Sequence, residues 1–332
     1  MRHTDEIADA LRAHLLTLGE AVLARFLTVR REHGAEELAG VQHVALADTI
    51  YVIDHAVEGL ILEWLEAHWP AEHPVDLVME GVDEPRTFPA AALPGAPRRT
   101  LIIDPIDGTR EIMWDRRSAW FLAALAPGAA GSSRLAGIET AVMVELPPTR
   151  HRHAQLLSAR RGQGAQLARR DLQQGEGHPA ALAPFAGEDL EHGFAGFSTP
   201  LVEGKGRVGR FAEAFFTAYA GKPARGLAIF DDQYLSTGGQ MFDLLSGRLR
   251  LFGDLRPLFL DQTDGPPPLV CHPYDVVGKL VAEELGCVIE APDGSPLDVP
   301  LDLTTPVAWV GFANERIAAR ARPILRRLLP SL

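Results

Sequence analysis

Apolar residues recur at steps of three and four along two stretches near the start of the chain. The first stretch, residues 5–30, carries them at Ile7, Leu11, Leu15, Leu18, Val22 and Phe26. The second stretch, residues 48–69, carries them at Ile53, Val57, Leu60, Ile61, Trp64 and Leu65. This spacing puts the apolar side chains on one face of a helix. We therefore predict two amphipathic helices, and Pro70 would end the second.

Shorter apolar runs follow, with turn residues between them, and these runs predict β-strands. They span residues 98–104, 118–126 and 137–147, and the glycine-containing stretch 127–134 would connect the last two. The segment 155–168 is typical of a hairpin, because Gly162 and Gly164 lie at its centre.

The second half of the chain alternates strand-like and helix-like segments. Residues 227–247 predict a strand and a loop followed by a helix. Residues 272–286 predict a further helix, which would begin at Pro273 and end at Gly286, because an apolar stripe lies between these two residues.

The length and composition change this picture in two ways. A chain of 332 residues is long enough for two domains, and 46% hydrophobic residues can form a large core. Residues 171–193 are rich in glycine, proline and acidic side chains and show little periodicity. We therefore predict two α+β or α/β domains, an N-terminal one over residues 1–193 and a C-terminal one over residues 194–332.

The charge and the terminal sequence exclude several classes of function. The formal net charge is −12, whereas a nucleic-acid-binding surface needs a basic stripe. The two cysteines, Cys271 and Cys287, are too few for a disulfide framework and form no CxxC pair. The N-terminal sequence MRHTDEIADALRAHLL has no apolar signal region, and no stretch is apolar enough to span a membrane. We therefore expect a cytoplasmic protein that binds neither nucleic acid nor membrane.

The most informative short segment is DPIDGT, residues 104–109, directly after an apolar run. Pro105 favours an extended Asp104, and Gly108 allows a tight turn, so we expect a loop at the end of a strand. This loop would direct Asp104, Asp107 and the Thr109 hydroxyl towards one point. Two carboxylates about 4 Å apart repel by roughly 4 kcal/mol at an effective dielectric constant near 20, unless a cation lies between them. Oxygen ligands of this kind suit Mg²⁺, Mn²⁺ or Ca²⁺.

The DPIDGT segment resembles the signature of the inositol monophosphatase family, the magnesium-dependent and lithium-sensitive phosphomonoesterases. This family includes relatives of fructose-1,6-bisphosphatase and of 3′-phosphoadenosine 5′-phosphate phosphatase. Three further segments resemble the family in the right order: VDLVMEG with Glu80, DTIYVIDHAVEGLI with Asp54, and HPYDVVGKLVAEELG with Asp275. A fourth, YLSTGGQMFDLLSG, resembles the family's turn before a helix.

The resemblance implies a set of metal ligands. One Mg²⁺ ion would bind Glu80, Asp104 and the Ile106 carbonyl oxygen, and a second would bind Asp104, Asp107 and Asp275. A third, weaker ion near Glu80 is common in the family, and Mn²⁺ is a substitute for Mg²⁺. The family usually has a second glutamate after the first; here Gly81 occupies that position, and Asp83 or Glu84 could replace it.

The resemblance also implies catalytic and substrate-binding residues. Thr109, polarised by Asp54, would help the attacking water lose its proton, with Glu80 close by; Asp48 is the alternative to Asp54. The residues expected to contact the substrate are Asp107, Gly108, Thr109, Ser236, Thr237 and Gly238.

The fold expected from the resemblance is a layered αβαβα sandwich, and the expected assembly is a homodimer. The expected reaction is hydrolysis of a small phosphate monoester. The sequence REIMW after the motif has some likeness to the 3′-phosphoadenosine 5′-phosphate phosphatases, but inositol, fructose bisphosphate and histidinol phosphates remain open as substrates. Asp254, Arg110 and Arg225 are candidate specificity residues, and the proline-rich segment 254–274 has no assigned role. The alternative from another class is a regulatory or scaffolding protein that keeps this fold and binds a macromolecule.

Overall fold

The computed structural model describes residues 2–32, 45–82, 84–93, 95–260 and 269–332. Its helices are α1 (Arg2–Glu32), α3 (Ala45–His68), α4 (Thr109–Met113), α5 (Lys205–Ala220), α6 (Thr237–Leu245), α7 (Lys279–Glu284) and α8 (Glu315–Leu328). Short 3₁₀ helices are η1 (Leu135–Gly137), η2 (Arg256–Leu258) and η3 (Leu329–Ser331). Within the described residues, no helix has an apolar stretch of the length that a bilayer crossing requires.

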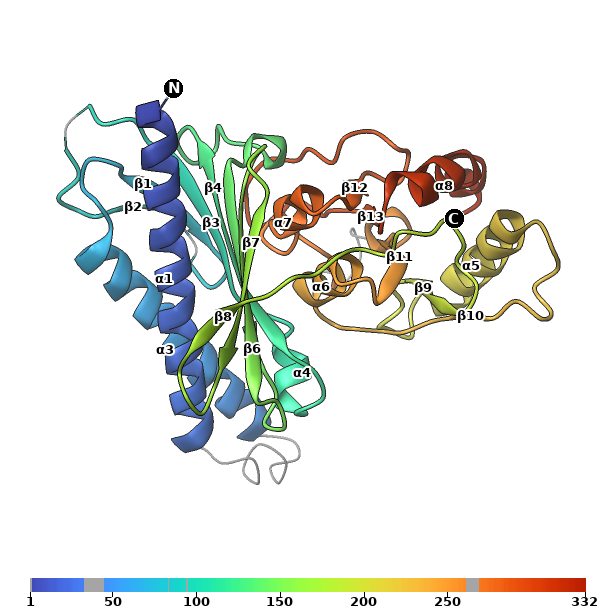
Figure 1. Ribbon diagram of the computed structural model, residues 1–332, viewed down its shortest axis with the longest axis horizontal. Helices are drawn as coiled ribbons and strands as arrows, with labels where there is room; N and C mark the ends of the chain where they lie inside the picture. Colours follow the sequence, from blue (N-terminus) through green and yellow to red (C-terminus); the bar gives the residue numbers. More distant parts are fainter. Residues whose placement is uncertain (1, 33–44, 83, 94, 261–268) are drawn as a thin grey trace.

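Two β-sheets form the frame of the molecule (Figure 1). The first has the strand order β2 (Arg86–Phe88), β1 (Val75–Met79), β3 (Arg99–Asp107), β4 (Ala119–Pro127), β5 (Thr140–Leu146), β6 (His153–Arg160), β7 (Ala165–Asp171) and β8 (Gly177–Pro179). The second has the order β10 (Ile229–Phe230), β9 (Gly193–Phe197), β11 (Leu249–Asp254), β13 (Trp309–Phe312) and β12 (Val288–Glu290).

The helices cover these sheets in alternating layers, as Figure 1 shows. Helices α1 and α3 pack on the outer face of the first sheet. Helices α6 and α7 lie between the two sheets, where one hydrophobic core takes residues from both halves of the chain. Helices α5 and α8 cover the other face of the second sheet. The expected αβαβα sandwich is therefore confirmed.

The apolar pattern predicted the elements of the N-terminal half well. The expected helices over residues 5–30 and 48–69 correspond to α1 and α3, and the expected strands correspond to β3, β4 and β5. The expected hairpin is β6 and β7, and its bend contains Gly162 and Gly164, both with positive φ. The two helices each bury one apolar face, whereas β3, β4 and β5 are buried on both faces and therefore show as continuous apolar runs.

The helix predicted over residues 272–286 is wrong in its first half. Residues 273–278 form turns, and α7 begins only at Lys279. The Asp275 side chain accepts a hydrogen bond from the His272 backbone N–H at 2.6 Å. The backbone bonds from Asp275 N to His272 O and from Lys279 N to Val276 O span three residues rather than four. Such local side-chain bonds compete with regular helix, and the apolar stripe does not report them.

Candidate metal centre

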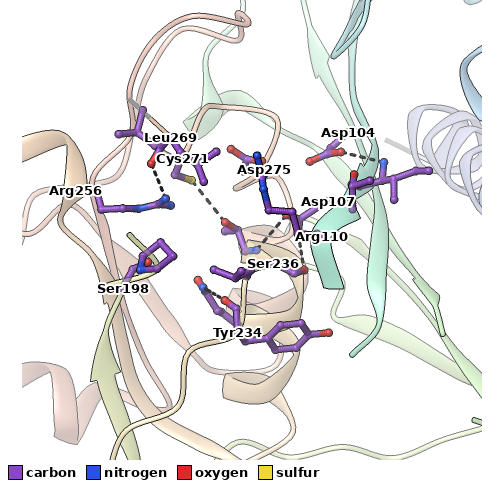
Figure 2. A pocket seen from close by; sticks show the side chains of 18 of the residues that line it. Asp104, Asp107, Arg110, Ser198, Tyr234, Ser236, Arg256, Leu269, Cys271 and Asp275 are labelled. Carbon is purple, nitrogen blue, oxygen red and sulfur yellow. Dashed lines mark hydrogen bonds between the residues drawn. The ribbon is translucent and has the colours of Figure 1, made fainter. Parts of the chain in front are cut away.

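Three carboxylates gather at one end of a cavity between the two sheets. Asp104, Asp107 and Asp275 each offer a carboxylate oxygen, and these oxygens lie within 4.8 Å of one another. The first two side chains are buried and the third is half-buried. Figure 2 shows this acidic end of the cavity opposite Arg256 and Leu269. Because Asp275 is 171 positions from Asp104 in sequence, the fold alone brings this group together.

A β-bulge puts Asp104 and Asp107 on the same face of the first sheet. Residues three apart on a regular strand point to opposite faces. In β3, however, Asp104 pairs with Leu122 and Asp107 pairs with Trp120, so β3 has one more residue than β4 between these pairs. The extra residue turns the second carboxylate back towards the first. The expectation of a loop directly after Asp104 is therefore wrong, because the strand continues to Asp107 through a bulge.

The parallel pairing of β1 and β3 places Glu80 beside Asp104. Met79 is in register with Ile103, and the Glu80 backbone N–H donates to the Ile103 carbonyl oxygen at 3.3 Å. Glu80 is exposed, and it lines the same cavity of about 140 Å³ as Asp104 and Ile106. The predicted first-ion ligands therefore lie around one space, although Glu80 is outside the compact group of three aspartates.

Asp107 is held by the turn that begins α6. The Ser236 hydroxyl donates to one carboxylate oxygen at 2.7 Å, and the Gly238 backbone N–H donates to the same oxygen at 2.6 Å. The Thr237 backbone N–H donates to the other oxygen at 3.2 Å. A side chain at position 238 would come within 2.8 Å of Leu122, so this turn needs glycine. Ser236, Thr237 and Gly238, which we expected to contact substrate, thus direct these donors at a predicted metal ligand.

Burial and mutual repulsion make the three aspartates hard to ionise. Burial, followed by the charges of Glu80 and Asp107, holds the pKa of Asp104 well above its usual range. Burial and the charge of Asp107 do the same to the pKa of Asp275. Burial also raises the pKa of Asp107 to about 6, against the lowering effect of its three donors in the Ser236 turn.

These properties fit a divalent cation. The donors are carboxylate oxygens and a backbone carbonyl, which suit Mg²⁺, Mn²⁺ or Ca²⁺ rather than the softer metals. A cation among them would reverse the repulsion that raises the pKa values of these acids. One carboxylate oxygen of Asp104 accepts a hydrogen bond from the Ile106 backbone N–H at 3.0 Å, which fixes the orientation of this side chain at the cavity.

A second cavity, of about 290 Å³, lies on the other side of Glu80, Ile106 and Thr109. Asp54 lines it, and burial followed by the charges of Glu80 and Glu58 raises the pKa of Asp54 to about 7. The Thr109 hydroxyl donates to the Ile106 carbonyl oxygen at 3.0 Å and not to Asp54, so the expectation that Asp54 polarises Thr109 through a direct hydrogen bond is wrong. The side chain of Asp48 lies outside the described residues.

The end of the first cavity opposite the carboxylates includes Arg256, which the sequence analysis missed. Arg256 lines the cavity, and Asp254 binds its guanidinium through both carboxylate oxygens. Asp254 is therefore a partner of Arg256, whereas Arg110 lines the cavity directly. Arg225 is exposed and does not line it. Of the segment 254–274, residues 261–268 lie outside the part of the chain that the structure describes.

Comparison with solved structures finds this architecture in bacterial proteins. SuhB from Mycobacterium tuberculosis is 16% identical with a TM-score of 0.61, and the match covers 96% of each chain. Inositol monophosphatase from Anabaena is 13% identical with a TM-score of 0.57, and the match covers 98% of this chain and 97% of that one.

Staphylococcal inositol monophosphatase II is 14% identical with a TM-score of 0.59, and the match covers 97% of this chain and 96% of the other. No protein-family model and no curated protein sequence matches the chain. These likenesses agree with the motif order, the five layers and the position of the carboxylates. The chain therefore has the inositol monophosphatase fold.

Proposed function

We propose that the protein is a Mg²⁺-dependent phosphatase that hydrolyses a small phosphate monoester. The observation that carries the proposal is the meeting of Asp104 and Asp107, from one strand, with the distant Asp275 at a cavity that Glu80 also lines. A protein that only kept the fold as a scaffold would not need this charge cluster. The complete aspartate set therefore favours the enzyme over the regulatory alternative.

The ligand set divides between two ions. Asp104, Asp107 and Asp275 would hold one, and Glu80, Asp104 and the Ile106 carbonyl oxygen would hold the other. When bound, Mg²⁺ activates water, polarises the phosphoryl group and stabilises the leaving oxygen. A third ion near Glu80, and Mn²⁺ as a substitute, belong to the same proposal.

Proton transfer from the attacking water would use the Thr109 side of the site. Because the Thr109 hydroxyl donates its hydrogen bond to the Ile106 carbonyl oxygen, the hydroxyl oxygen can accept a hydrogen bond from water. Asp54 lines the adjoining cavity, and its pKa of about 7 suits a group that takes a proton near neutral pH. Glu80 lies between the two cavities and would orient the same water.

The phosphate would lie against the backbone turn after Asp107. Gly108 has a φ of 93°, which L side chains rarely adopt, and a side chain there would come within 2.7 Å of the Ser236 Cβ. The backbone N–H groups of Gly108 and Thr109 would donate to phosphate oxygens. Ser236, Thr237 and Gly238 would contribute indirectly, since they orient Asp107.

The test is a phosphate-release screen over inositol, sugar, histidinol and nucleotide phosphates, with Mg²⁺ and with EDTA. Nucleotides are included because one similar solved structure, 14% identical, is an inositol monophosphatase II bound to 2′-AMP. We expect release from at least one ester with Mg²⁺, its loss in EDTA and inhibition by Li⁺. Turnover that survives complete chelation would contradict the proposal.

The expected homodimer and the expected cytoplasmic location remain predictions. Light scattering coupled to size-exclusion chromatography would measure the assembly directly. A mass twice that of the 36.0 kDa chain would support the dimer.

A further inference from the structure

Tyr234 is a buried tyrosine beside the metal centre, and its hydroxyl joins two segments that are far apart in sequence. It lies two residues before Ser236, on the segment that leads into α6, and it lines the first cavity (Figure 2). The residue is 8% exposed. Its hydroxyl donates a hydrogen bond to the Ser118 backbone carbonyl oxygen at 2.6 Å and accepts one from the Trp120 indole N–H at 3.2 Å.

The partners of this hydroxyl belong to the strand that pairs with Asp107. Trp120 is opposite Asp107 in the ladder of β3 and β4, and Ser118 directly precedes β4. The Ser236 turn, two residues after Tyr234, donates three hydrogen bonds to the Asp107 carboxylate over 2.6–3.2 Å. One hydroxyl thus ties the turn that supplies the donors to the strand pair that supplies the acceptor. Such bonds weaken beyond about 3.2 Å, so a small shift of the turn would loosen them.

Close packing fixes the ring of Tyr234. A Cβ atom built on Gly239 would lie 2.2 Å from the Tyr234 Cζ atom, so the ring lies directly against the start of α6. The Gln240 side-chain amide donates to the Tyr234 backbone carbonyl oxygen at 2.6 Å. The Arg117 guanidinium lies 5.0 Å from the ring centroid and binds both carboxylate oxygens of Asp232. The hydroxyl is therefore presented to β4 in one orientation.

We propose that Tyr234 is a positioning residue of the metal centre, because its hydroxyl sets the place of the Ser236 turn and thereby the geometry of Asp107 as a metal ligand. This inference rests on the proposed function, in which Asp107 binds a metal ion. A tyrosine with a structural role alone would affect stability, whereas a positioning tyrosine also affects the affinity for the ion.

The experiment compares Tyr234→Phe with Tyr219→Phe, each of which removes one buried hydroxyl. Tyr219 is 5% exposed, lies on α5 at the far face of the second sheet, and donates to the Glu188 backbone carbonyl oxygen at 2.7 Å. Titration calorimetry with Mg²⁺ alone measures affinity without substrate. We expect Tyr234→Phe to bind Mg²⁺ at least about tenfold more weakly than the wild type, the usual cost of losing a group that orients a metal ligand. We expect Tyr219→Phe to bind Mg²⁺ like the wild type, although both variants should melt at a lower temperature.

A second measurement needs no metal. Hydrogen exchange of the Gly238 backbone N–H in EDTA, followed by nuclear magnetic resonance, reports the bond from this group to Asp107. We expect faster exchange in Tyr234→Phe and wild-type exchange in Tyr219→Phe.

Wild-type Mg²⁺ affinity together with wild-type Gly238 exchange in Tyr234→Phe would overturn the inference, and phosphate release by the wild type would then still support the proposed function. If Tyr234→Phe does not fold, Arg117→Ala removes the guanidinium beside the same ring. Its control is Arg320→Ala, because the Arg320 guanidinium lies 4.4 Å from the Tyr219 ring centroid. Equal Mg²⁺ affinity of these two arginine variants would overturn the inference equally. A wild type that binds no Mg²⁺ and hydrolyses no ester refutes the proposed function, and with it the role of Tyr234 in metal binding.

Discussion

Asp104 is the most deeply buried acid of the metal centre. The residue is 1% exposed, and its carboxylate accepts a hydrogen bond from the Ile106 backbone N–H. Three negative neighbours, Glu80, Asp107 and Asp275, raise its pKa in addition to burial. A neighbouring cation would stabilise the anionic form of such a group, so the proposed metal ion would set the charge state of Asp104.

We predict that Asp104→Asn lowers kcat by at least about 100-fold, in the range that loss of a group that stabilises charge typically costs. Asparagine has the same size and can still accept the Ile106 hydrogen bond, so the fold should remain. Phosphate release at saturating Mg²⁺ measures the effect, and circular dichroism checks the fold. Near wild-type turnover would mean that the catalytic centre is elsewhere.

The raised pKa values also predict the pH dependence of stability without metal. The folded state holds protons on Asp54, Asp104 and Asp107 more tightly than the unfolded chain does, where aspartate has a pKa of about 3.9. The stabilising protonated forms are complete below about pH 4 and are lost as the pH rises through the folded pKa values. For Asp107 and Asp54 those values are about 6 and about 7.

In EDTA, these groups should therefore make the free energy of unfolding fall between about pH 4 and pH 8. Urea denaturation across this range measures it. Asp104→Asn should show a flatter decline, because the variant lacks one of the repelling charges. The Mg²⁺-induced increase in stability should be larger at the alkaline end, where no proton competes with the ion. Parallel curves for the wild type and the variant would contradict this explanation.

At the scale of elements, the start of α6 has two tasks. Ser236 caps the helix, because its hydroxyl oxygen accepts a hydrogen bond from the Gly239 backbone N–H at 2.9 Å. The same hydroxyl donates a hydrogen bond to the Asp107 carboxylate. Helix stability and the orientation of a predicted metal ligand therefore depend on one side chain.

We predict that Ser236→Ala reduces the free energy of unfolding by about 1 kcal/mol, the usual cost of a lost N-cap. It should also weaken Mg²⁺ binding, and more so near pH 6, because loss of the donor raises the pKa of Asp107 further. Urea denaturation and Mg²⁺ titration calorimetry measure the two effects. Asn314→Ala is the matched control, because Asn314 caps α8 through the Ile317 backbone N–H, far from the site. If both variants keep wild-type Mg²⁺ affinity, Ser236 acts only as a cap.

The limits of sequence analysis lie at this scale too. The long helices and the importance of the DPIDGT segment followed from strong local patterns, and the layer order followed from the family resemblance of that segment. The bulge between Asp104 and Asp107 did not, because it is defined by pairing with β4. The same applies to the position of Arg256 at the cavity, opposite carboxylates from distant segments. These features arise from chain segments that meet only in the folded protein.

At the scale of the whole molecule, the metal centre joins the two halves of the chain. Asp104 and Asp107 belong to the first sheet, whereas Asp275 precedes α7 in the layer between the sheets. The three carboxylates repel one another when no ion is present. A bound ion should therefore stabilise the packing between the layers as well as the local site.

We predict that Mg²⁺ raises the melting temperature of the wild type much more than that of Asp275→Asn. The variant loses a ligand, and stabilisation by an ion follows its affinity for the folded state. Without Mg²⁺ the variant should melt at or above the wild-type temperature, because one repelling charge is gone. Equal Mg²⁺-induced increases in the two proteins would remove Asp275 from the metal centre.

The distance in sequence between Asp104 and Asp275 has a consequence for synthesis in the cell. A ribosome completes β3 long before it adds Asp275, so a nascent chain has its first two aspartates without the third. The Ser236 turn, which orients the Asp107 carboxylate, is likewise synthesised long after Asp107. The full ligand set exists only once most of the chain has emerged and both sheets have docked. If the proposed function holds, metal loading would be a late event in synthesis, and a bound ion would mark a fully folded molecule.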